Sequence, residues 1–128
     1  MPIVTDRIQG ASASLAFKAP VRCASTGNLT LSGFQTIDGV TPTSTEHVDL
    51  RRVLVKGQSA QAENGIYDMQ SGAWTRAKDF DSVIDFRKGT RIYVANGTAQ
   101  SSAEYVVSNA MDPLTFSMDV SSITFSSR

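Results

Sequence analysis

The strongest single candidate for catalytic chemistry is His47, the one histidine of the chain, which lies in a polar segment between Glu46 and Asp49. An imidazole oriented by a neighbouring carboxylate can act as a general base. No serine-centred nucleophile motif accompanies His47, and the chain has one cysteine, Cys23. One histidine and one cysteine nearly exclude Cys/His zinc clusters and Cys–His nucleophilic pairs. We therefore expect no catalytic site and no enzyme activity.

A group of acidic residues, Asp79, Asp81 and Asp85, is the candidate for a metal site. Their spacing begins like a calcium-binding loop, but Val83 stands at the fifth position and no bidentate glutamate follows. Carboxylates that cap the start of a short helix explain the same residues. We expect no metal and no cofactor.

Other residues are candidates for binding. Arg51-Arg52, beside a predicted strand, could contact phosphate, although an isolated basic pair usually solvates a sheet edge. Trp74 and Arg76 could stack on a sugar, whereas a lone tryptophan more often closes a core. Cys23, with apolar flanks, is more typical of a small buried residue than of a reactive thiol.

The composition limits the class of partner. Twelve Lys+Arg balance 12 Asp+Glu, so a net charge of zero argues against nucleic acid or an anionic membrane surface as a partner. No apolar run is long enough to span a bilayer, and the first residues lack the pattern of a signal peptide. Together with the single cysteine, this favours a protein made and kept in a reducing cytoplasm or within an assembly.

Strands must position these side chains, because the chain is rich in the β-branched residues Val, Ile and Thr (30 together) and has only 6 Leu. The clearest strand is Arg52–Lys56, with Val53 and Val55 on one face and Leu54 on the other. Tight turns are predicted at Asp38-Gly39 and at Asn64-Gly65, where we expect positive φ angles.

The chain is long enough for one core. We predict an all-β domain over residues 20–128, a small sandwich or barrel of roughly seven to nine short strands. One helix of at most about three turns is expected at residues 79–88, capped by Asp79 or Asp81.

Residues 1–19 are predicted to be an extended N-terminal arm, because their apolar residues follow neither a strand nor a helix period. A frayed terminus would explain the same pattern. We expect instead that the arm docks on another subunit, because each apolar side chain returns about 1.5–3 kcal/mol when buried. The docking residues would be Ile3, Val4, Ile8, Leu15 and Phe17.

A series of segments follows in a recognisable order: Asn28–Gly33, Gln35–Val40, Arg52–Gln58, Asn64–Tyr67, Gly72–Asp81 and Ile123–Phe125. The series resembles a β-rich module that recurs in tail-fibre and other virion structural proteins of tailed bacteriophages. The resemblance runs from about Val21 to Phe125. The loop before Arg52 is longer than usual, and Leu50-Arg51 stands where the module usually has Gly-Asp.

The resemblance implies that the turn residues and the apolar residues of these segments build the fold, while function lies on the surface. The fold-defining residues would be Asp38, Gly39, Val53, Val55, Asn64, Gly65, Tyr67, Trp74 and Phe125. It implies a non-enzymatic virion structural protein, a fibre, spike or adaptor subunit that docks on a phage head or tail through its arm. Its partners would be other virion proteins and itself, as a homotrimer or alternatively a ring of five or six.

Two other functions stay open at this point. The chain could be a carbohydrate- or receptor-binding module that recognises a host surface glycan through Trp74, Tyr93 or Tyr105 on an exposed face. It could also be an enzyme, such as an accessory of a cell-wall hydrolase, which normally requires paired carboxylates or a metal site.

Overall fold

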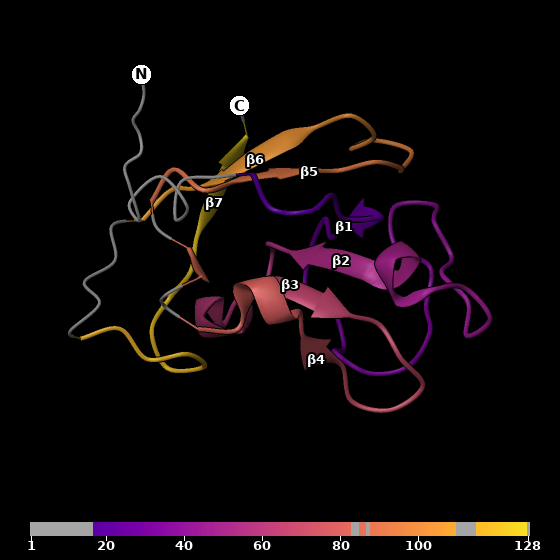
Figure 1. Ribbon diagram of the computed structural model, residues 1–128, viewed down its shortest axis with the longest axis horizontal. Coiled ribbons are helices and arrows are strands. Elements are labelled where there is room, and N and C mark those ends of the chain that lie inside the picture. The colour runs from indigo at the N-terminus through magenta and orange to yellow at the C-terminus, as the bar shows by residue number, and fades with distance from the viewer. Residues whose placement is uncertain (1–16, 83–84, 87, 110–114, 128) are drawn as a thin grey trace, which may run out of the picture.

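The computed structural model describes residues 17–82, 85–86, 88–109 and 115–127. Their strands form two sheets (Figure 1). The four-stranded sheet has the order β1-β2-β3-β4, with bounds Cys23–Ala24, Arg52–Val55, Gly65–Asp68 and Thr75–Arg76. The three-stranded sheet has the order β5-β6-β7, with bounds Arg91–Tyr93, Glu104–Val107 and Phe125–Ser127. The all-β prediction is confirmed.

Strand β2 lies at the centre of the four-stranded sheet, parallel to β1 and antiparallel to β3. Its side chains are buried on both faces. Leu54 packs in the core between the sheets, with Ile66 of β3 and Ile92 of β5. Val53 and Val55 pack in a second core on the opposite face. The predicted assignment of these residues to two faces is confirmed, because alternate residues of a strand point to opposite sides.

The second core is covered by the long connection between β1 and β2. Tyr67 and Trp74 belong to it, with ring centroids 6.4 Å apart. Partly buried apolar residues of the connection pack against this cluster: Leu29, Leu31 and Phe34. Phe125 packs instead against the core between the sheets, 6.0 Å from the Phe80 ring.

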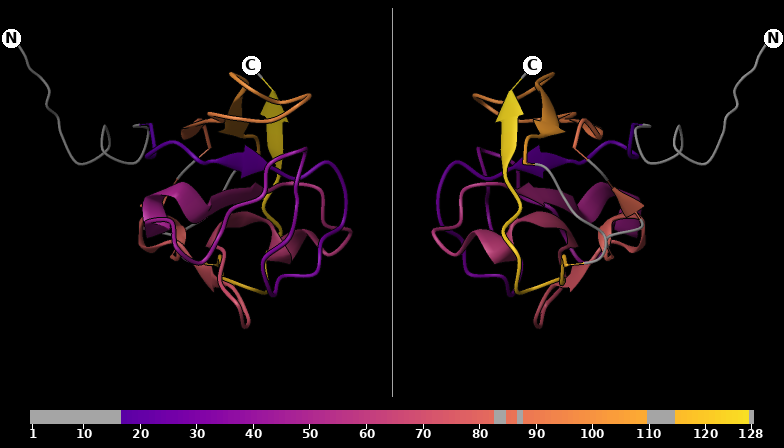
Figure 2. Two further views of the ribbon diagram at one scale, coloured as in Figure 1. Left: turned by 90° about the vertical axis from the view of Figure 1, so that its right-hand side faces the viewer. Right: turned by 90° about the vertical axis from the view of Figure 1, so that its left-hand side faces the viewer.

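One segment, from Phe17 to Ser25, joins the edges of the two sheets. Its first half lies parallel to β5, where the Val21 N–H donates to the Tyr93 carbonyl at 3.0 Å. Its second half is hydrogen-bonded to β2, where the Ser25 N–H donates to the Leu54 carbonyl at 2.9 Å. Figure 2 shows this segment passing between the two sheets on one side of the domain. Phe17, the first described residue, therefore already contacts the β-domain.

The prediction of a helix at residues 79–88 is wrong for the described residues. The described residues contain only short 3-10 helices: η1 at Val48–Arg51, η2 at Gln61–Glu63 and η3 at Lys78–Phe80. Positions 83, 84 and 87 lie outside the described residues. Asp79 is inside η3 and Ala77 precedes it without a side-chain cap. No described helix is both long and apolar enough to cross a membrane.

The two predicted tight turns differ from each other. Asp38 and Gly39 have φ angles of 51° and 81°, and Ile37 and Val40 exchange two backbone hydrogen bonds across them. This is the expected two-residue hairpin turn. At the second turn Asn64 has a φ of −64°, so the expected positive φ is wrong for this residue.

Gly65 alone has a positive φ at the second turn, 149°. A Cβ at Gly65 would lie 2.4 Å from Nη1 of Arg76. The glycine is therefore required by the close approach of a guanidinium group as well as by its backbone angle.

Candidate functional site

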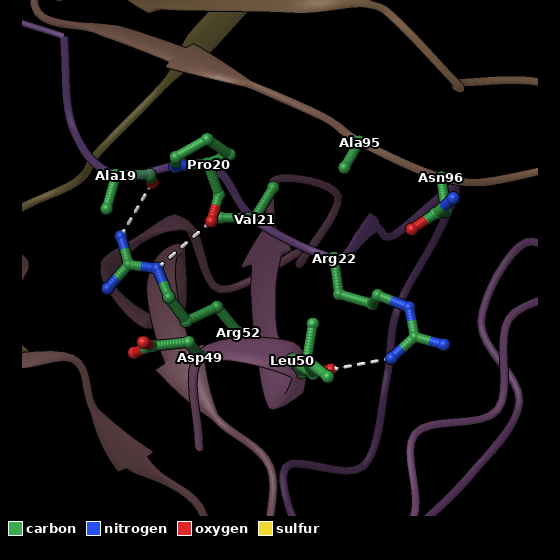
Figure 3. Close-up of a pocket in the computed structure, with 9 residues that line it drawn as sticks. All are labelled: Ala19, Pro20, Val21, Arg22, Asp49, Leu50, Arg52, Ala95 and Asn96. Carbon is green, nitrogen blue, oxygen red and sulfur yellow. Dashed lines mark hydrogen bonds between the residues drawn. The ribbon is translucent and has the colours of Figure 1, made fainter. Parts of the chain in front are cut away.

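A pocket of about 330 Å³ lies where the described chain enters the β-domain. Figure 3 shows the residues that line it: Ala19, Pro20, Val21, Arg22, Asp49, Leu50, Arg52, Ala95 and Asn96. They come from the segment before β1, from η1 and β2, and from the residues that follow β5. Its size is at the lower end of the range for ligand pockets.

Arg52 forms one fixed wall of the pocket. Its Nη1 and Nη2 each lie 3.0 Å from one carboxylate oxygen of Asp79. Its Nη2 also donates to the Ala19 carbonyl at 2.9 Å, and its Nε donates to the Pro20 carbonyl at 3.3 Å. Four of the five guanidinium N–H donors are thus used, and the side chain is nearly buried. Arg52 therefore anchors the entering segment.

Arg22 lies on the other side of Leu50 in the view of Figure 3. Its Nη1 donates to Oε2 of Glu46 at 3.1 Å and to the Leu50 carbonyl at 3.0 Å. Hydrogen bonds from the Thr43 N–H and from Arg22 hold the pKa of Glu46 below its ordinary value. Nε and Nη2 of Arg22 donate to no described residue, and the side chain is 22% exposed. Arg22 is therefore the cation of the pocket with spare donors.

Apolar surface and one carboxylate complete the rim. Leu50 is 47% exposed, which is high for a leucine beside buried residues such as Val21. Asp49 is largely exposed and lies 3.4 Å from Nδ1 of His47. The pocket therefore combines an apolar surface with one available guanidinium group and one available carboxylate.

A second hollow, of about 410 Å³, lies on the far side of Arg52 and is lined by Val48, Asp49, Arg52, Asp68, Lys78 and Asp79. Burial raises the pKa of Asp68, and the nearby Arg52 partly offsets that shift. The Arg52–Asp79 pair occupies its wall. Five of its six lining residues carry a charged side chain, against three of nine in the first pocket.

The residues that the sequence singled out for catalysis have other positions. The Nδ1 atom of His47 accepts a hydrogen bond from the Asp49 N–H at 3.2 Å, which caps η1. Asp79 binds Arg52. Oδ2 of Asp85 accepts the N–H groups of Asp81 and Ser82, so it caps a turn. Among the described residues, no three His, Cys, Asp or Glu side chains are grouped to hold a metal ion.

Three of the candidate residues, Trp74, Arg52 and Cys23, are buried. Trp74 is 6% exposed, and its indole N–H donates to the Gly33 carbonyl at 2.8 Å. A sugar cannot stack on it in this structure. Arg52 is buried, so the interpretation of the Arg51-Arg52 pair as a solvated edge is wrong for Arg52. Cys23 is fully buried, and burial raises the pKa of its thiol to about 12.

Of the arm residues predicted to dock, only Phe17 lies within the described residues, and Ile3, Val4, Ile8 and Leu15 lie outside them. Phe17 pairs with Arg91 at the edge of the three-stranded sheet and is 55% exposed. The Arg91 guanidinium lies 5.5 Å from the centre of its ring. An exposed aromatic side chain therefore stands where the arm meets the domain.

Comparison with known proteins adds no relative: no family model, curated protein sequence or solved structure matches this chain.

Sequence reasoning did not identify the pocket. Its three groups of residues lie about Arg22, Leu50 and Asn96, far apart in the chain. The one available signal was Leu50-Arg51, which stands where the expected pattern has Gly-Asp.

Proposed function

We propose that the protein is a non-enzymatic structural subunit of a bacteriophage or phage-like particle, located in the virion and attached through its N-terminal arm. The observation that supports it is that the segments which resemble the phage module contact one another in space. Segments that recur together as one module are expected to contact one another, because they then stabilise one fold together.

The contacts link segments that lie far apart in sequence. The side chain of Gln58 donates to the Leu29 carbonyl at 3.1 Å and accepts from the Leu29 N–H at 2.7 Å. Trp74 donates to the Gly33 carbonyl. Arg76 donates to the Asn64 carbonyl at 2.9 Å. The recurring residues thus hold the loops of the four-stranded sheet in place.

The segment that directly follows residues 1–16 also supports attachment. The segment before β1 is fixed by Arg52 and β5 from Lys18 onward, since the Lys18 N–H donates to the Arg91 carbonyl at 2.9 Å. A partner that binds residues 1–16 would therefore be joined to a segment that is hydrogen-bonded to both β5 and Arg52. As an oligomer we propose a homotrimer, with a ring of five or six as the alternative.

The test is to purify particles from the cells that encode this chain and to probe them with an antibody against it. We expect the full chain to sediment with the particles. A variant without residues 2–16 keeps every contact that Phe17–Pro20 make with the other described residues, so it should fold and yet be lost from the particles. Normal occupancy by this variant would show that the arm is not the anchor. Absence of the full chain from the particles would refute the proposed function.

Recognition of a host glycan is the second candidate, and it rests on Tyr93. This side chain is 39% exposed on β5, whereas Trp74 is buried and the Tyr105 hydroxyl donates to Gln100. Exposed aromatic rings with a polar tip are suited to sugars. Replacement Tyr93→Ala should abolish binding to host cells without affecting incorporation into particles if this function exists.

A further inference from the structure

We propose that the pocket lined by Arg22, Leu50 and Asn96 receives the N-terminal arm of a second copy of this chain, with Val4, Asp6 and Ile8 as the inserted residues. The inference rests on the proposed assembly function and names the surface that its arm would bind.

The pocket and the arm sequence match in apolar character and in charge. In an extended segment alternate residues share a face, so Val4, Asp6 and Ile8 would point the same way. They present an apolar, an acidic and an apolar side chain. The pocket offers apolar walls from Pro20, Ala95 and Leu50, with Arg22 at its rim.

The charged groups of the pocket can pair with charged groups of the arm. Nε and Nη2 of Arg22 donate to no described residue, and a carboxylate such as Asp6 can accept from both. On the next face of the arm, Arg7 carries the charge opposite to that of the exposed Asp49. Arg52 remains paired with Asp79 and holds the pocket wall that it forms in place.

The direction of the segment before β1 indicates which copy supplies the arm. The segment Phe17–Val21 runs along β5, with Phe17 beside Arg91 and Val21 beside Val94. Ala19 to Arg22 line the pocket. An arm that continues this strand backward from Phe17 moves away from the pocket, and it would have to reverse to reach its own copy. A neighbouring copy is the direct donor, and such an exchange of arms makes a closed ring or trimer.

Disulfide trapping in the full chain tests the inference. A Val4→Cys variant is mixed with a Leu50→Cys variant under mild oxidation, both as purified protein and within purified particles. Cys23 is fully buried and its thiol stays protonated at neutral pH, so it does not compete. We expect a covalent dimer of one Val4→Cys chain with one Leu50→Cys chain.

Two matched controls define the specificity. Thr5→Cys places the thiol on the opposite face of an extended arm and should be trapped less. Val120→Cys replaces a more accessible residue, 77% exposed against 47% for Leu50, next to Asp119, which pairs with Arg76 of β4 at the other edge of the four-stranded sheet. It should give no dimer with Val4→Cys. Equal trapping at Val120→Cys would overturn the inference.

A charge exchange tests the pairing itself. Arg22→Glu should lower the trapped fraction by about tenfold, because it places two like charges at the contact. Adding Asp6→Arg to the arm donor should restore trapping. Trp74 fluorescence verifies that both variants remain folded. Failure of the second change to restore trapping would overturn the assigned pair.

The double variant Val4→Cys/Leu50→Cys distinguishes the donor. A disulfide within one chain, independent of protein concentration, would overturn exchange between copies. If the chain is present in particles but no Leu50→Cys dimer forms there, the pocket is not the receptor and the proposed function stands. If the chain is absent from particles, the proposed function fails, and trapping in the purified protein still decides whether the pocket binds the arm.

Discussion

Asn64 provides the sharpest test of how this fold is held together, because two explanations of the residue predict opposite effects of one substitution. As a turn residue, Asn64 would act through its backbone, and Asn64→Gly would be harmless. In the structure its φ is −64° and its side chain is 2% exposed. Its Oδ1 accepts the Gln58 N–H at 3.1 Å, and its Nδ2 donates to the Ile123 carbonyl at 2.9 Å.

The expected cost follows from these two hydrogen bonds. Asn64→Gly leaves a buried N–H of Gln58 and a buried carbonyl of Ile123 without their partner. Each such group costs about 1–3 kcal/mol, so the free energy of unfolding should fall by about 2–5 kcal/mol. Asn64→Ala should lose slightly less, because glycine adds backbone entropy to the unfolded chain.

Urea denaturation followed by the fluorescence of Trp74 measures the effect. A loss of about 3 kcal/mol lowers the midpoint by roughly 1–3 M for a domain of this size. The matched control is Asn28, which exchanges two hydrogen bonds with Ser59 at an exposed position. Asn28→Gly should cost less than about 1 kcal/mol, because water replaces the lost partner. An Asn64→Gly variant as stable as the wild type would refute the reasoning.

Other parts of the fold yield further predictions. Gly39→Ala should cost about 1–3 kcal/mol in thermal denaturation, because its φ is 81° and the new Cβ would lie 2.4 Å from Oγ1 of Thr98. Asp79→Ala should cost about 1–3 kcal/mol, less than for a fully buried pair, since Asp79 is 34% exposed while Arg52 is nearly buried; a loss that vanishes in high salt would contradict this. The Cys23 thiol, with its pKa raised from 9.0 to about 12, should react with a disulfide reagent at pH 8 only after unfolding. In the folded state the Cys23 thiol keeps its proton to higher pH than in the unfolded chain. The contribution of Cys23 to the free energy of unfolding should therefore decline as the pH rises from about 9 toward 12, and Cys23→Ala should remove that decline.

The sequence by itself determined the features that depend on neighbouring residues. The alternation of Val53, Leu54 and Val55 assigned their faces, because the side-chain period of a strand is two. Asp38-Gly39 determined a tight turn, because a two-residue hairpin needs positive φ at both positions. The abundance of the β-branched residues Val, Ile and Thr and the scarcity of Leu indicated the all-β class.

Only the tertiary structure decided where the polar groups would be paired. Arg52 and Asp79 are 27 residues apart, and Asn64 and the Ile123 carbonyl are 59 apart. The pocket likewise needs Arg22, Leu50 and Asn96 to meet. Which donors and acceptors lose water, and which partners then reach them, depends on the packing of distant segments. Local patterns therefore specify strands and turns, while the buried pairs and the pocket exist only in the folded chain.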